Sequence, residues 1–213
     1  MNSNKFRTPT FAFIHIPKTG GTSIRNHLQK LNTGRDKSIT TPSSPWGHRA
    51  AITVKRQVPD DCITFAVVRN TWSRIASLYK YSAPQQDFSQ WICDMISGKI
   101  GISISQLYFI TDSNISTSKI NNNKKMVFKQ HIYSDNIIVD YLLRFENLKQ
   151  DWEYMCWVLN IPYTTLPHDN KTLAKDNMDY RDLYTLDNVE CIEEHFSQEI
   201  EYFGYKFNKL VTK

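Results

Sequence analysis

Residues 11–23 read FAFIHIPKTGGTS, and this stretch constrains the fold more than any other part of the chain. Residues 11–16 are apolar at every position except His15, which is the pattern of a strand buried on both faces of a parallel sheet. Residues 22–31 follow with apolar side chains at helical spacing. A buried strand, a glycine turn and a helix in this order predict an α/β protein with a parallel sheet.

The alternation of strand and helix recurs twice further along the chain. CITFAVVRN at 62–70 predicts a second buried strand, and TWSRIASLYKY at 71–81 predicts the helix after it. Residues 136–145 predict a third strand, followed by a helix from Leu148 to Leu159. The expected fold class is therefore α/β, a single domain over 1–213 with a central parallel sheet flanked by helices.

The remaining segments are less regular. Residues 85–110 are interpreted as helical, and the polar residues 111–125 are interpreted as a surface insertion. A final helix is expected from a capping box formed by Asp187 and Glu190, running to Gly204 as the residue after its C-terminus.

Composition limits the kinds of partner. The chain has 213 residues and a formal net charge of +5, which favours anionic ligands without requiring nucleic acid, and no basic block suggests a nucleic-acid arm. No signal peptide and no apolar stretch of transmembrane length are recognised, so a soluble cytoplasmic protein without a membrane span is expected.

The four cysteines have no spacing that predicts a metal site or a redox pair. They are Cys62, Cys93, Cys156 and Cys191. We expect no disulfide framework, and three of the four lie in apolar settings that suggest burial as small hydrophobic residues.

The loop PKTGGTS at 17–23 has the chemistry of an anion site. At a strand-to-helix junction, unpaired backbone N–H groups and the helix dipole favour a phosphate or a sulfate. The candidate binding residues are Lys18, Thr19, Gly20, Gly21, Thr22 and Ser23. The lysine precedes the glycines, whereas a Walker A loop has it after them. A plain turn with no ligand is the alternative interpretation.

A second candidate site lies in VVRNTWSRIASLY at 67–79. Arg69 ends the predicted strand and Ser77 lies on the helix after it. Ligands of open α/β sheets bind beyond the carboxyl ends of the strands, where an arginine and a hydroxyl suit a terminal phosphate. A solvated or ion-paired Arg69 is the alternative, and Arg74 is interpreted as a surface or ion-pair residue.

These two motifs together resemble the sulfotransferase superfamily. FIHIPKTGGTSI is similar to its loop for the 5′-phosphosulfate of 3′-phosphoadenosine 5′-phosphosulfate (PAPS), and VVRNTWSRIASLY to its 3′-phosphate motif. Residues 142–162 and 166–207 resemble the carbohydrate sulfotransferases of the Golgi and bacterial branch, sulfotransferase family 2. The family often has proline where this chain has Thr71, and the region around 111–125 matches it poorly.

The resemblance implies a nucleotide-kinase-like fold and PAPS as co-substrate, with no metal. It also implies that Lys18 stabilises the leaving group, that the loop binds the 5′-phosphosulfate, and that Arg69 and Ser77 bind the 3′-phosphate. The acceptor would be a hydroxyl of a carbohydrate or glycolipid. The acceptor's identity and the oligomeric state are not predicted.

Six histidines are candidates for the base that takes the acceptor's proton. His48, in WGHRAA, matches a context in which the family often has its base and is our candidate. We interpret His15 and His27 as structural and His195 as a surface or boundary residue. His131 lies in no motif, and His168 is expected to shape the cofactor or substrate edge. Glu146 is a weaker candidate for the base.

Two other functions are compatible with the same motifs. A nucleotide kinase of the same fold would require Mg²⁺ and ATP, and the position of the lysine argues against it. A non-catalytic binder of 3′-phosphoadenosine nucleotides would bind the nucleotide without transferring sulfate.

Overall fold

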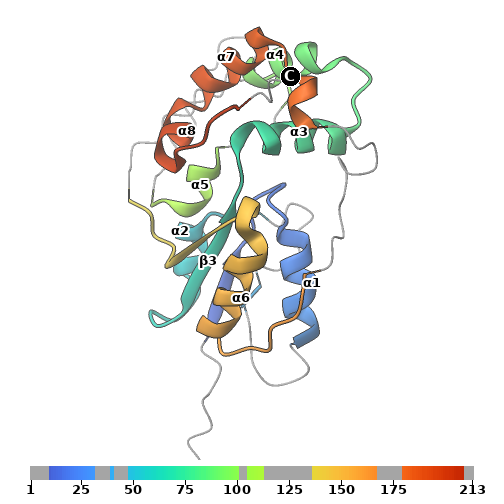
Figure 1. The fold of residues 1–213 in the computed structure, drawn as a ribbon. Coiled ribbons are helices and arrows are strands. Elements are labelled where there is room, and N and C mark those ends of the chain that lie inside the picture. The colour runs from blue at the N-terminus through green and yellow to red at the C-terminus, as the bar shows by residue number, and fades with distance from the viewer. Residues whose placement is uncertain are drawn as a thin grey trace, which may run out of the picture. The chain divides into compact units, whose positions relative to one another are not determined.

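The computed structural model describes residues 10–31, 39–40, 48–100, 105–112, 136–166 and 179–208 (Figure 1). Their contacts form two compact units. The sheet unit comprises the described residues within 10–68, 109–112 and 136–166, and the helical unit those within 69–108 and 179–208. The prediction of one domain over 1–213 stays a prediction.

A parallel sheet forms the centre of the sheet unit. Its strands are β1 (Phe11–Ile14), β2 (Ile39–Thr40), β3 (Ile63–Val68) and β4 (Tyr141–Arg144). Their order is β2-β1-β3-β4, and all three pairings are parallel. In the register, Phe13 lies opposite Phe65 and Val67 opposite Leu143. The α/β class with a central parallel sheet is thus confirmed.

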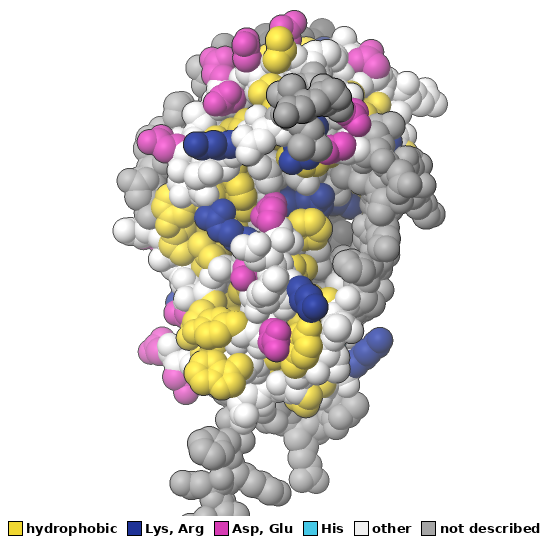
Figure 2. All heavy atoms as spheres, in the orientation of Figure 1, with side chains coloured by type: hydrophobic (Ala, Val, Ile, Leu, Met, Phe, Trp, Pro, Cys, Tyr) yellow, Lys and Arg dark blue, Asp and Glu magenta, His cyan; other side chains and the backbone are white. Residues whose placement is uncertain are grey.

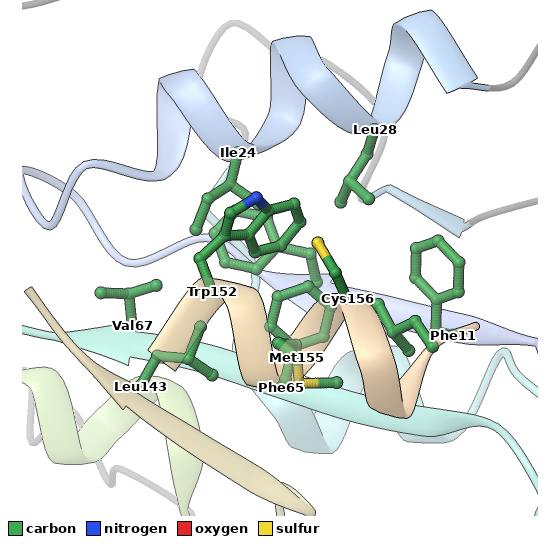
Figure 3. Packing of buried hydrophobic residues seen from close by; sticks show 11 residues of the cluster. Phe11, Ile24, Leu28, Phe65, Val67, Leu143, Trp152, Met155 and Cys156 are labelled. Atoms are coloured by element: carbon green, nitrogen blue, oxygen red, sulfur yellow. The ribbon is translucent and has the colours of Figure 1, made fainter. Parts of the chain in front are cut away.

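Two helices cover one face of this sheet. They are α1 (Gly21–Leu31) and α6 (Leu148–Val158), which follows the short 3₁₀ turn η1 (Phe145–Asn147). Side chains on one face of a strand recur every second residue, and those on one face of a helix recur every three or four residues. The apolar side chains of the sheet and of the two helices therefore meet in a single layer (Figure 3). Its buried residues are Phe11, Phe13, Ile24, Leu28, Phe65, Val67, Leu143, Trp152, Met155, Cys156 and Leu159. Helix α2 (Ala51–Lys55) contacts β1.

The third predicted strand is shorter than expected, because Asp140 interrupts it. Oδ2 of Asp140 accepts hydrogen bonds from the backbone N–H of Thr64 at 2.6 Å and from its hydroxyl at 2.7 Å. The side chain of Asp140 therefore accepts from the N–H of Thr64, while its own N–H donates to the backbone O of Thr64 at 2.9 Å, and β4 begins only at Tyr141. Before Asp140, Ile137 forms an isolated antiparallel bridge with Thr111.

That bridge also corrects the start of the predicted insertion. Thr111 is 1% exposed, so the surface insertion expected at 111–125 does not begin there. Residues 113–125 lie outside the described part of the chain.

The helical unit contains α3 (Thr71–Ser82), α4 (Phe88–Ile96), η2 (Tyr180–Leu183), α7 (Leu186–His195) and α8 (Ser197–Phe203). Of the region expected to be helical over 85–110, the described residues form two separate helices, α4 and α5 (Gln106–Ile110). Asp87 begins α4 by accepting a hydrogen bond from the N–H of Gln90 at 3.0 Å.

The final helix was predicted wrongly at its start and in its continuity. Thr185 is the N-cap, because its hydroxyl accepts from the N–H of Asn188 at 3.2 Å, and Asp187 lies inside the first turn. The helix then breaks at Phe196, with φ −109° and ψ 23°, and α8 begins a new segment. Gly204 ends α8 with a left-handed φ of 65°, as expected.

All four cysteines are free thiols. Cys62 and Cys156 are buried, whereas Cys93 and Cys191 are exposed, so burial holds for two cysteines rather than three.

None of the described helices is long and apolar enough to cross a membrane. Acidic and basic side chains are interspersed on the face drawn in Figure 2.

Candidate active site

The glycine loop lies between β1 and α1, as predicted. Two of its residues have left-handed backbone, Lys18 with φ 67° and Gly20 with φ 84°. This conformation costs a non-glycine residue free energy and is concentrated at functional sites. The loop therefore holds its lysine in a strained conformation next to the helix N-terminus.

The hydroxyls of the loop differ in what they can offer a ligand. Thr19 is fully buried, and its Oγ1 donates to the backbone O of Ile16 at 2.9 Å. The hydroxyl proton of Thr19 therefore stabilises the loop, and the donor it can offer an anion is its backbone N–H. Ser23 is buried and Thr22 half-buried at the start of α1.

Both glycines are needed because other side chains lie directly against them. A Cβ built on Gly21 would be 2.6 Å from Nε2 of His15 and even closer to its Cδ2. A Cβ on Gly20 would be 3.0 Å from Cε2 of Phe145. The loop therefore packs against two rings, that of His15 directly after β1 and that of Phe145 in η1.

His48 is hydrogen-bonded to the backbone between β1 and the glycine loop. Its Nδ1 lies 2.9 Å from the backbone O of His15, and the two rings meet edge-on with centroids 4.6 Å apart. A carbonyl oxygen only accepts, so Nδ1 of His48 is the donor, and in the neutral ring Nε2 carries the lone pair. This tautomer is the one a general base requires.

His15 has a different character. It is 7% exposed, and burial, followed by the charges of His48, Arg25 and Lys18, lowers the pKa of its imidazole from 6.5 to about 3. His15 is therefore neutral at pH 7 and a weak base. The interpretation of His15 as structural agrees with its packing under Gly21.

The other candidate bases lie elsewhere or cannot be placed. Nδ1 of His27 is 2.8 Å from the hydroxyl of Thr164, and its ring meets Trp152 edge-on, which agrees with a structural role. His195 is half-buried and Glu146 is exposed. His131 and His168 lie outside the described residues.

In the helical unit, Arg69 is held next to the first turn of α3. Its Nε donates to Oγ of Ser73 at 2.9 Å. Ser73 and Ser77 are four residues apart on α3 and therefore share a face, and both are buried. Ser73 was not predicted from the sequence, although its spacing of four from both Arg69 and Ser77 is visible there.

Arg74 is 2% exposed, so its interpretation as a surface residue was wrong. Burial lowers the pKa of its guanidinium, and the charge of Glu199 opposes that effect. The ion-pair interpretation of Arg74 thus agrees with the presence of the buried Glu199, which was not predicted from the sequence.

The two motifs belong to different units. β1 and β3 are adjacent parallel strands, so their carboxyl ends lie at the same edge of the sheet. The glycine loop follows β1, and Arg69 follows Val68 at the end of β3. The predicted convergence of both motifs on one nucleotide stays a prediction.

Comparison with known proteins assigns the chain to a family. The model of the sulfotransferase family matches residues 6–206. The chain belongs to the sulfotransferase family. The match includes both motifs, so the resemblance noted in the sequence is confirmed, and the chain is an enzyme of the class predicted.

A solved structure shows the same fold for this sulfotransferase. The crystal structure of mouse sulfotransferase SULT7A1 complexed with PAP superposes with a TM-score of 0.52 at 11% sequence identity. The alignment covers 91% of this chain and 85% of the mouse chain. The predicted sulfotransferase fold is thus confirmed. A search of curated proteins found no match.

Proposed function

We propose that this sulfotransferase transfers the sulfuryl group of PAPS to a hydroxyl of a saccharide. Its family membership supports sulfuryl transfer, and the mouse neighbour of the same fold is complexed with PAP, the nucleotide that PAPS becomes when it loses its sulfuryl group. The similarity of residues 142–162 and 166–207 to carbohydrate sulfotransferases supports a saccharide or glycolipid acceptor.

The donor-binding residues follow from the chemistry of the two motifs. The backbone N–H groups of Thr19 to Ser23 and the cation of Lys18 would bind the 5′-phosphosulfate at the N-terminus of α1. Arg69 and Ser77 would bind the 3′-phosphate, which distinguishes PAPS from ATP. No step in this proposal uses a metal.

The transfer itself is an in-line displacement at sulfur. The acceptor oxygen bonds to sulfur while the bond from sulfur to the bridging oxygen breaks, and negative charge accumulates on the departing phosphate. Lys18 stabilises that charge more in the transition state than in the ground state. The acceptor's proton goes to Nε2 of His48.

One observation carries this assignment of the base. The hydrogen bond of 2.9 Å from Nδ1 of His48 to the O of His15 fixes the tautomer and joins His48 to the residue directly after β1, three positions before Lys18. His15 is a poorer candidate because the pKa of its buried imidazole is about 3. The two neighbouring histidines thus differ in environment: His15 is buried and weakly basic, whereas His48 is exposed.

A transfer assay with ³⁵S-labelled PAPS tests the proposal. We expect label on a saccharide from a panel of glycans, lipids and phenols, with the same rate in the presence of a metal chelator. Arg69→Ala should raise the KM for PAPS by about 10- to 100-fold, because a charge-assisted contact is lost. If Arg69→Ala and Lys18→Ala both left turnover and PAPS affinity intact, the proposal would be wrong.

The same assay separates the alternatives. Binding of PAP without transfer to any acceptor would indicate a non-catalytic nucleotide binder. Magnesium-dependent ATP turnover would indicate a kinase, which family membership argues against. A cytoplasmic location remains a prediction that cell fractionation would test.

A further inference from the structure

A buried glutamine holds the backbone of Arg69 in the helical unit. The N–H of Arg69 donates to Oε1 of Gln106 at 2.8 Å, and Nε2 of Gln106 donates to the backbone O of Arg69 at 2.8 Å. One side-chain amide thus pairs with both backbone groups of one residue. Gln106 is fully buried, so these bonds are shielded from water.

A buried carboxylate in turn holds Gln106. Glu199 on α8 is 1% exposed, and its oxygens accept bonds from both the backbone N–H and Nε2 of Gln106, each at 2.6 Å. The hydroxyls of Ser105 and Thr71 donate to it at 2.8 and 2.7 Å. Four donors thus surround the two oxygens of Glu199, and the guanidinium of Arg74 is also close to it.

Thr71 at the start of α3 supplies one of the four bonds to Glu199. Its side chain is fully buried, and its hydroxyl donates to Oε1 of Glu199 at 2.7 Å. A residue without a hydroxyl at this position would leave the carboxyl group with one donor fewer.

We propose that Gln106, held by Glu199, is a positioning residue that orients Arg69 toward the 3′-phosphate of the nucleotide. This inference rests on the proposed function, in which Arg69 binds that phosphate. Gln106 fixes the backbone of Arg69, and Ser73 holds its Nε. The terminal Nη atoms are then oriented before the ligand arrives, which lowers the entropic cost of binding.

The test compares two nucleotides that differ only at the 3′ position. PAP carries 3′- and 5′-phosphates, and AMP carries the 5′-phosphate alone. Gln106→Met keeps the length of the side chain and removes all its hydrogen bonds. We expect calorimetry to give about 5- to 30-fold weaker PAP binding, with AMP binding changed less than about twofold. The KM for PAPS should rise while kcat stays nearly constant.

A double-mutant cycle identifies the route of the effect. In an Arg69→Ala background, Gln106→Met should leave PAP binding unchanged, because the residue it orients is gone. Asn188→Leu is the matched control, since it removes another buried amide of the helical unit, one that donates to Ser89 at 2.9 Å. That variant should alter stability without altering the ratio of PAP to AMP affinity.

The outcomes separate this inference from the proposed function. If Arg69→Ala leaves the preference for PAP over AMP intact, the assignment of Arg69 is wrong. If Arg69→Ala abolishes that preference and Gln106→Met does not reduce it, only the positioning role is wrong. An equal loss of PAP and AMP binding in Gln106→Met would also overturn it, because that result indicates general structural damage.

A milder variant keeps the test decisive if Gln106→Met does not fold. Thr71→Val removes one of the four bonds to Glu199 and keeps the shape of the side chain. We expect a two- to five-fold loss of PAP affinity, roughly, with AMP affinity unchanged, and recovery in Thr71→Ser. No change in the ratio for Thr71→Val would overturn the role of the network.

Discussion

The imidazole rings of His15 and His48 meet edge-on, with centroids 4.6 Å apart, although 33 residues separate them in sequence. One ring is buried under the glycine loop, and the other is on an exposed residue before α2. In the proposed mechanism the pair divides two tasks. The buried ring of His15 packs against the loop, and the exposed His48 is the proposed base.

His48→Asn tests the base without removing the contact to His15. The asparagine amide can still donate to the O of His15 but cannot take up a proton near neutral pH. We expect kcat to fall by about 100- to 10,000-fold, with PAP affinity and melting temperature nearly unchanged. Steady-state transfer kinetics and calorimetry measure these quantities, and a near-normal kcat would assign the base elsewhere.

Lys18 should show a conflict between stability and activity. Its φ of 67° is costly for any residue with a Cβ and is not costly for glycine. Lys18→Gly should therefore be more stable than Lys18→Ala by about 1 kcal/mol in urea unfolding. Both variants should lose at least about 100-fold in kcat, because neither stabilises the leaving phosphate. Equal stability of the two would contradict the left-handed conformation.

The buried His15 should make stability depend on acidity. In the unfolded chain its imidazole has a pKa of 6.5, whereas in the folded protein the pKa is about 3. As the pH falls below 6.5 the unfolded state binds a proton that the folded state does not, so the free energy of unfolding decreases until about pH 3. Between pH 7 and pH 5 this amounts to about 2 kcal/mol.

A non-titrating ring isolates that contribution. His15→Phe keeps an aromatic side chain against the loop, and its loss of stability from pH 7 to pH 5 should be smaller than that of the native protein by about 2 kcal/mol. Urea unfolding at both pH values measures the difference. Identical pH profiles for the two proteins would show that His15 is not buried as described.

Gly21→Ala tests the close contact between the loop and His15. A Cβ would meet the imidazole at 2.6 Å from Nε2, so we expect a loss of about 1–3 kcal/mol in stability and weaker PAP binding. Gly204→Ala is the control, because a Cβ there meets nothing within 4 Å and only its φ of 65° is strained. That control should lose about 1 kcal/mol of stability and keep its PAP affinity.

A compensating change sharpens the result. Adding His15→Ala to Gly21→Ala removes the ring that the new Cβ would meet. The double variant should therefore lose less stability than the sum of the losses measured for the two single variants. Simple additivity would mean that the loop moves away from His15 instead.

The sequence by itself determined the strand-loop-helix unit, the parallel sheet and the two candidate ligand motifs. Each is a local pattern: apolar runs identify buried strands, apolar residues at helical spacing identify α1 and α6, and glycines next to a lysine identify the loop. Each of these patterns can be recognised from a short run of consecutive residues. The family model, by contrast, matches residues 6–206, which is almost the whole chain.

Only the tertiary structure decided which distant side chains complete those motifs. The partners of Glu199 lie 93, 94 and 128 residues away along the chain, and a glutamate in an amphipathic helix is ordinarily exposed. Its burial is favourable only because four donors meet there, which no local pattern specifies. The contact of His15 with His48, the break of the last helix at Phe196 and the late start of β4 depend on packing or pairing in the same way.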